Sequence, residues 1–142
     1  MTALHTALQT FWGGFTYGTA IKAYPQDNVP STVPDPSTGA PIPTPFPYIT
    51  YEVVEGAYWG ATILTAFVWM KKDAGTGWQV QRAAILDLIK AAIPEGGTHL
   101  DYADGNLFIR RNPANFMSYY DDPNDASVAG GRISYEATYY TL

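Results

Sequence analysis

Eight of the eleven prolines of this 142-residue chain lie in one segment, from Pro25 to Pro47. Because proline has a fixed φ and no backbone N–H, this segment cannot form a helix or a central strand. Structureless segments of this length are uncommon inside compact domains and are usually functional or disordered. The proline content favours a semi-rigid, extended arm of polyproline II type. The sequence therefore predicts a single domain over residues 1–142 with a proline-rich loop or arm at residues 25–47; a surface insertion of little function is the alternative.

Two helices are expected around this segment. The first lies near the N-terminus, where apolar residues recur every three or four positions: Leu4, Ala7, Leu8, Phe11, Trp12 and Phe15. The strongest helix pattern covers Trp78 to Ile93, and Pro94 ends it. Its expected apolar face consists of Val80, Ala84, Ile85, Leu88, Ile89 and Ala92. Both helices are expected on the same face of a sheet, which is the natural two-layer packing.

The expected sheet is made of segments with alternating or wholly apolar patterns: Tyr17–Tyr24, Pro47–Val54, Ala61–Met70, Thr98–Tyr102, Leu107–Arg110 and Arg132–Tyr140. Ala61–Met70 is apolar on both faces, so it should be central and covered. A turn at Asp104-Gly105-Asn106 predicts a β-hairpin, and Asn112–Asp125 is expected to be irregular. The predicted fold class is α+β: an antiparallel β-sheet with two helices packed on one face, a long proline-rich arm and a projecting β-hairpin.

The charge balance argues against a protein that grips nucleic acid. The chain has 8 Lys and Arg against 13 Asp and Glu, for a net charge of −5. Binding a phosphate backbone needs clustered cations, although an acidic chain can pass DNA through a repelling channel. Its longest uncharged apolar stretch falls short of the roughly 20 residues that a membrane-spanning helix needs. A soluble protein, intracellular when it is made and without membrane contact, is expected.

The residue types that carry chemistry are sparse. Cysteine is absent, which excludes disulfides, thiolate zinc sites and cysteine nucleophiles. Only His5 and His99 are available as bases, they are far apart in sequence, and no nucleophile-elbow motif accompanies them. The acids Asp121, Asp122 and Asp125 fail the EF-hand template, because Ala126 and Arg132 stand at its glycine and glutamate positions. We expect no catalytic residue, no cofactor and no metal.

The order of these segments resembles the tail terminator proteins of long-tailed bacteriophages, also called tail completion or minor capsid proteins. The resemblance rests on the amphipathic N-terminal helix, a strand that exits at Tyr24-Pro25, and the strand Pro47-Tyr48-Ile49-Thr50-Tyr51-Glu52. It continues through the helix at Trp78–Ile93 and the alternating C-terminal strand after an acidic loop. It covers nearly the whole chain, except that the proline-rich arm is longer than expected for the family.

The resemblance implies a structural virion protein of the tail-neck region, assembled in the host cytoplasm. Such proteins form a hexameric ring on the head-proximal end of the tail tube, end tube polymerisation and present a surface to the head-tail connector or stopper protein. Duplex DNA passes through the lumen without specific binding. The family has no catalytic site and no cofactor, and its partners are other copies of itself, the tube protein and the connector.

Within this framework we assign three sets of residues from loops and hairpins. The subunit interface is expected at Pro34, Pro36, Pro41, Pro43, Tyr119 and Tyr120, because the arm can strap onto a neighbour and tyrosine is enriched at interfaces. Contact with the tube or connector is expected at Asp104, Asn106, Arg110 and Arg111, around the hairpin. The channel lining is expected at Asp121, Asp122 and Asp125, since acids do not hold DNA.

Three other functions stay open at this level. Another head-tail joining protein or a tail tube subunit has a similar size or fold, and a tube subunit would polymerise into long tubes. A small ligand-binding domain, in which tyrosines hold a sugar or another flat ligand, belongs to a different class; its ligand would stabilise the folded state. An enzyme would require an activity that is lost when His5 or His99 is changed.

Overall fold

The computed structural model describes residues 2–53, 62–73, 77–102 and 105–141. Within them the helices and strands follow in the order α1 (Thr2–Trp12), β1 (Thr16–Tyr17), β2 (Thr19–Ala20), β3 (Lys22–Pro25), β4 (Thr32–Pro34), β5 (Pro41–Pro43), β6 (Tyr48–Tyr51), β7 (Thr62–Lys71), α2 (Trp78–Ala92), β8 (Thr98–Tyr102), β9 (Gly105–Arg111), β10 (Met117–Asp121) and β11 (Val128–Thr141). The predicted α+β class is confirmed. Val54, the end of one predicted strand, Ala61, the start of the next, and Asp104, the start of a predicted turn, lie outside the described residues.

The main sheet is mixed, so the prediction of a purely antiparallel sheet is wrong in one pair. The strand order is β3-β6-β7-β11-β9-β8, and β10 also pairs with β11. All neighbours are antiparallel except β3 and β6, which run parallel from Lys22↔Tyr48 to Pro25↔Tyr51. Parallel neighbours need a long crossover connection. The proline-rich segment supplies that connection, because it joins the end of β3 to the start of β6.

β11 is the longest strand, and it holds the sheet together. One edge pairs with β7 from Val128 to Ala137. The other edge pairs first with β10 and then with β9, in line along the strand. The loop at 112–116 leaves the ladder between them, bracketed by the hydrogen bonds Asn112 N–H to Ser134 C=O and Ser134 N–H to Phe116 C=O. The region predicted as irregular therefore contains a strand, and Gly130 and Gly131 lie inside β11 instead of before it.

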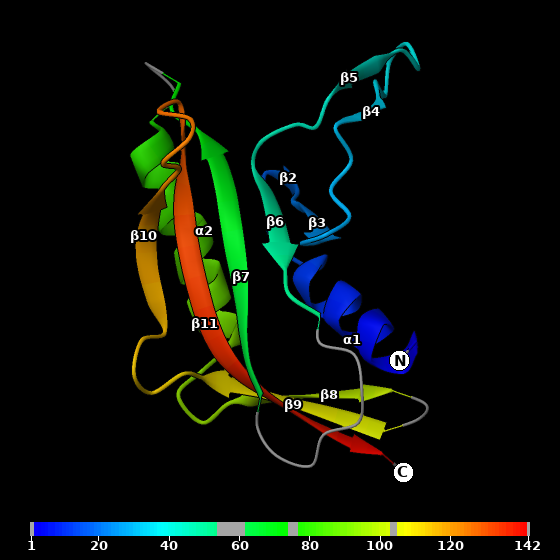
Figure 1. Cartoon of the computed structure of the whole chain (residues 1–142), viewed down its shortest axis with the longest axis vertical. Helices are drawn as coiled ribbons and strands as arrows, with labels where there is room; N and C mark the ends of the chain where they lie inside the picture. Colours follow the sequence, from blue (N-terminus) through cyan, green and yellow to red (C-terminus); the bar gives the residue numbers. More distant parts are fainter. Residues whose placement is uncertain (1, 54–61, 74–76, 103–104, 142) are drawn as a thin grey trace.

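Both helices pack on one face of the curled sheet, as predicted (Figure 1). From α1, Trp12 is fully buried and its indole Nε1–H donates to the hydroxyl of Tyr135 on β11, at 3.3 Å. From α2, Leu86 lies against Gly131 of the same strand and the same face. The buried core between them includes Leu8, Ile49, Leu64, Ala66, Val68, Ile85, Ile89, Leu107, Ile109 and Ile133.

The opposite face of the sheet carries no helix among the described residues. On β7, Leu64, Ala66 and Val68 point to the helices and are buried. Ile63, on the other face, is 59% exposed, and Phe67 and Trp69 are only half-buried. The prediction that this strand is covered on both faces is wrong. The sequence pattern shows that both faces of the strand are apolar, but it does not show whether helices cover one face of the sheet or both.

Helix α2 has the predicted extent but is rotated relative to the predicted face. Leu86 is 4% exposed, while Val80 and Leu88, predicted to be buried, are 70% and 40% exposed. The helix is apolar around more of its circumference than one sheet can cover, so its outer side retains apolar residues. Neither α1 nor α2, the helices of the described segments, has the length and apolar character of a membrane span.

The proline-rich segment is a hairpin instead of a polyproline II arm. β4 and β5 pair antiparallel at Thr32↔Pro43, Val33↔Ile42 and Pro34↔Pro41. The predicted strand Tyr17–Tyr24 is likewise divided, because Gly18 (φ 74°) makes a tight turn between β1 and β2 before β3 begins. Pro25 does not stop β3 but is its last residue. A proline is tolerated there because β3 is the edge strand.

The two glycines of β11 give a matched test of this packing. A Cβ on Gly130 would lie 1.6 Å from the Val68 carbonyl oxygen, whereas one on Gly131 would meet the movable end of Leu86 at 2.4 Å. Gly130→Ala should therefore lower the free energy of unfolding by about 3 kcal/mol, and Gly131→Ala by about 1 kcal/mol. Urea unfolding followed by tryptophan fluorescence measures both; equal losses would contradict the close approach of the two backbones at Gly130.

Candidate interaction surfaces

The β4–β5 hairpin carries the prolines that were predicted to lie at an interface. Asp35 N–H donates to Ala40 C=O and Thr44 N–H to Ser31 C=O, at 2.8 and 3.3 Å. By the alternation of an antiparallel ladder, Val33 and Ile42 form the hydrogen-bonded pair between them. The prolines at 34, 41 and 43 therefore occupy non-hydrogen-bonded positions, where the missing N–H removes no hydrogen bond between β4 and β5. All three are exposed, and so is Pro36 in the turn.

This placement also blocks the outer edge of the hairpin. Residues 41 and 43 would direct their N–H groups away from β4, and both are proline. An edge without donors does not accept a further strand easily. Contacts made by this hairpin are therefore contacts of side chains, above all of exposed pyrrolidine rings.

Tyr119 and Tyr120 lie on opposite faces of β10, so the structure does not bring them together. Tyr119 faces α2 and is 64% exposed. Tyr120 faces the uncovered side of the sheet, where its ring centroid lies 5.1 Å from that of Phe67 and 5.5 Å from that of Trp69. The alternation of side chains along a strand separates two neighbours that the sequence analysis had grouped as one surface.

The uncovered side of the sheet forms an aromatic surface. Phe67 and Trp69 stack at 5.3 Å, and the Trp69 Nε1–H donates to Thr50 Oγ1 at 2.8 Å. Tyr48 lies beside Tyr24 and Phe46 in the same region. Burial raises the pKa of the Tyr48 hydroxyl, and the charge of Asp122 raises it further. The acidic loop therefore borders this surface.

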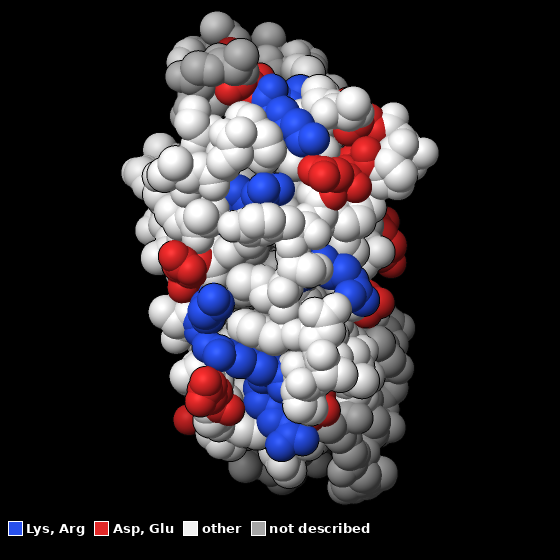
Figure 2. All heavy atoms as spheres, turned by 90° about the vertical axis from the view of Figure 1, so that its left-hand side faces the viewer, with Lys and Arg blue, Asp and Glu red and all other residues white. Residues whose placement is uncertain are grey.

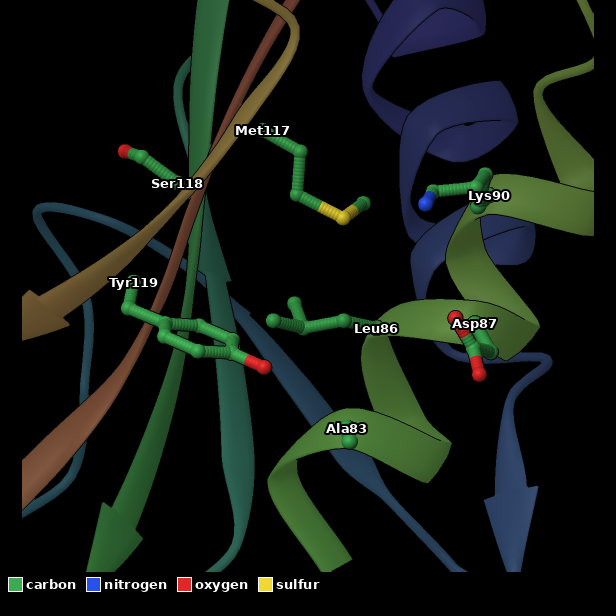
Figure 3. A pocket seen from close by; sticks show the side chains of 7 residues that line it. All are labelled: Ala83, Leu86, Asp87, Lys90, Met117, Ser118 and Tyr119. Atoms are coloured by element: carbon green, nitrogen blue, oxygen red, sulfur yellow. The ribbon is translucent and has the colours of Figure 1, made fainter. Parts of the chain in front are cut away.

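A groove of about 340 Å³ lies between α2 and β10 (Figure 3). Ala83 and Leu86 of α2 and Met117 of β10 supply its apolar part. Tyr119 lies over one end, and the charged side chains of Asp87 and Lys90 stand along the helix side. The groove is not predictable from the local sequence pattern, because it requires β10, a segment predicted to be irregular.

Arg82 is held beside the groove by two aromatic rings. Its guanidinium carbon lies 3.8 Å from the centroid of the Tyr119 ring and 4.9 Å from that of Trp78. Such stacking orients the planar guanidinium and leaves its N–H groups free to donate. The buried Nε of Arg82 has no acceptor, and neither Arg82 nor Lys90 forms an ion pair, within the described part of the chain. The groove is thus lined by the cation of Lys90 and the carboxylate of Asp87, and Arg82 lies beside it.

Cations are concentrated on this side of the molecule. Seven of the eight Lys and Arg residues lie between residues 71 and 132, on or next to β7, α2, β9 and β11. Figure 2 shows their side chains spread from end to end over the side that carries α2 and β10. Residues 23–70 contain four acids and no Lys or Arg. The segments 23–70 and 71–132 therefore differ in charge, because nearly all cations lie in the second, although the whole protein is acidic.

The residues predicted to contact a tube or connector serve internal contacts in this monomer. Asn106 bonds to the ring Nδ1 of His99 and to Asp101, at 2.8 and 2.6 Å. Arg110 pairs with Glu136 at 2.5 Å. Arg111 donates to the carbonyls of Lys90 and Ile93, at 3.0 and 2.7 Å, and so caps the C-terminus of α2. Asp104 is not among the described residues, and the contact itself stays a prediction.

The three acids predicted to line a channel lie on and after β10. Asp121 pairs with Lys72 at 3.3 Å, and Asp122 accepts the N–H of Asn124 at 2.9 Å. Asp125 accepts both the hydroxyl and the N–H of Ser127, at 2.6 and 2.9 Å. These hydrogen bonds lower the pKa of Asp125. Two of the three carboxylates are thus held by turns of their own loop, and no cluster that could bind a metal occurs in the described ranges.

Comparison with family models, with curated proteins and with solved structures finds no match to this chain.

The two histidines lie on different elements. His5 lies on α1, and His99 lies on β8, where its ring packs on Phe108 with the ring centroids 4.5 Å apart.

The carboxylate of Asp125 offers a direct test of the loop geometry. Ser127→Ala removes one of its two hydrogen bonds, so the pKa of Asp125 should rise toward its ordinary value of 3.8. Because folding lowers the pKa of Asp125, its ionised carboxylate stabilises the folded state at pH values above the ordinary pKa. This stabilisation is lost as the pH falls through the lowered pKa of the folded state. NMR titration of the carboxyl carbon measures the shift, with Ser118→Ala as control; an unchanged Asp125 titration would contradict the hydrogen bond.

Proposed function

We propose that this chain is a structural protein of a bacteriophage tail, which forms a ring at the head-proximal end of the tail tube. The ring caps the tube, ends its polymerisation and joins it to the head connector while leaving a channel for DNA. The resemblance stated from the sequence motivates the proposal. The single observation that supports it in the fold is the presence of two unlike exposed surfaces on opposite sides of the monomer.

These surfaces are the proline-rich hairpin and the side formed by α2 and β10 (Figure 1). A ring requires heterologous contacts, in which one patch of a subunit meets a different patch of the next. A monomer that exposes two different patches on opposite sides meets this requirement. Three of the six exposed large apolar residues in the described part of the chain lie on α2 and β10: Val80, Leu88 and Tyr119.

Most of the predicted residues keep their roles in this proposal, except that Tyr120 faces the other side of the sheet, Arg111 caps α2, and Asp104 lies outside the described residues. Pro34, Pro36, Pro41 and Pro43 would contact one neighbour, and Tyr119 would contact the neighbour on the other side. The β8–β9 hairpin, proposed to project toward the tube or the connector, would present Asn106 and Arg110. The loop with Asp121, Asp122 and Asp125 would face the lumen.

Negative-stain electron microscopy of the purified protein at high concentration tests the proposal. We expect rings of one symmetry with a central hole wide enough for duplex DNA. Long tubes would contradict a terminator and indicate a tube subunit. A protein that stays monomeric in the presence of preformed tail tubes, and that is stabilised by a small flat ligand, would indicate a ligand-binding domain instead.

The channel assignment has its own test in assembled virions. Replacing Asp121, Asp122 and Asp125 together with lysine should slow DNA ejection, because new phosphate contacts would form in the lumen. The matched control replaces the same three residues with asparagine, which removes the negative charge without adding a cation. Ejection that is equally fast in the wild type and the lysine variant would rule these residues out as the lining.

A further inference from the structure

We infer that the groove between α2 and β10 of one copy receives the β4–β5 hairpin of the next copy, with Asp35 facing Arg82 and Lys90. This inference rests on the proposed ring and names the contact that builds it. Its basis is the fit between two surfaces of the same chain in shape, chemistry and charge.

The apolar chemistry of the two surfaces matches. The groove has a floor of Ala83, Leu86 and Met117 and an aromatic wall at Tyr119. The hairpin exposes four pyrrolidine rings, which are apolar and can pack against an aromatic ring, as the prolines of polyproline II peptides do in aromatic-lined grooves. The outer edge of β5 lacks N–H donors, so the hairpin can contribute side chains to a groove but not a strand to a sheet.

The hairpin is ordered before it binds. Four backbone or side-chain hydrogen bonds hold its turn, among them Ser37 N–H to Asp35 Oδ1 at 2.8 Å and Gly39 N–H to Asp35 C=O at 2.8 Å. A preformed hairpin loses less conformational entropy on docking than a free loop would. The same turn holds the Asp35 carboxylate at the tip.

The charges of the two surfaces are complementary. Asp35 is the one charged residue between Asn28 and Tyr51. On the groove side, Arg82 is oriented by Tyr119 and Trp78 but has no anionic partner, and the exposed Lys90 has none either, within the described residues. An incoming carboxylate would satisfy the guanidinium and would offset the local excess of positive charge. Complementary charges at such a contact set its register and direction.

The geometry makes this a contact between copies. The β4–β5 hairpin lies on the opposite side of the molecule from α2 and β10 (Figure 1), which line the groove, so one chain cannot dock onto itself. Each copy would give its hairpin to one neighbour and its groove to the other. Contacts of this kind propagate head to tail and close into a ring when the rotation between copies permits it.

Cysteine cross-linking tests the contact on a chain that has no cysteine of its own. The variant Ser37→Cys/Ala83→Cys places one thiol at the hairpin tip and one in the groove. Under mild oxidation by diamide it should give covalent trimers and larger species, ending at the ring number. Ser37→Cys/Thr10→Cys, with the second thiol on the exposed side of α1, is the matched control and should give no species beyond a dimer.

Sedimentation of the wild type under the same conditions separates the two proposals. If the wild type assembles but Ser37→Cys/Ala83→Cys gives no covalent species beyond a dimer, the hairpin–groove contact is wrong and the ring proposal stands. If the wild type stays monomeric, also with preformed tail tubes present, and no ladder forms, both proposals fail.

Charge reversal gives a second, independent test. Asp35→Lys and Lys90→Glu should each weaken self-association by about tenfold, because each brings like charges together. The double variant restores the attraction and should recover most of the loss. Lys90 is chosen over Arg82 because it is exposed and does not take part in the aromatic stacking that holds Tyr119. Additive losses in the double variant would overturn the proposed pairing.

Discussion

Strand β11 is the element on which the rest of the structure depends. It pairs with β7 along one edge and with β10 and β9 in succession along the other, so it joins both halves of the sheet. The pairing needs Gly130, where the backbone of Val68 leaves no room for a Cβ, and Leu86 of α2 occupies the space over Gly131. Further along β11, the hydroxyl of Tyr135 accepts a hydrogen bond from the indole N–H of Trp12 on α1. One strand therefore positions both helices.

Placing both helices on one face has a direct consequence for the surface. The other face keeps an aromatic cluster of Phe67, Trp69 and Tyr120 that no described helix covers. The sheet also covers only one side of α2, so Val80 and Leu88 stay exposed beside the groove. Exposed apolar surface of this kind is common at protein–protein contacts. The proposed ring would use the part on α2 and β10, and it leaves the aromatic cluster without an assigned partner.

The proline-rich segment serves both the fold and the proposed assembly. Its length allows the chain to leave β3 and return parallel to it as β6. The excess length folds back as the β4–β5 hairpin, on the side of the molecule opposite to α2 and β10 (Figure 1). The crossover thus sets where the hairpin lies, and with it the direction of the head-to-tail contact that we infer.

The sequence by itself determined the elements whose signals are local. Periodicity predicted α1 and α2, alternation predicted β6 and β11, and a run that is apolar on both faces predicted β7. Proline excluded a helix or central strand from residues 25–47. Only the tertiary structure decided the parallel pairing of β3 with β6, the strand β10, the exposure of Val80, and the meeting of Arg82 with Tyr119. These features depend on contacts between residues far apart in the chain. A local pattern states that a face is apolar, but the three-dimensional arrangement decides which apolar faces find a cover.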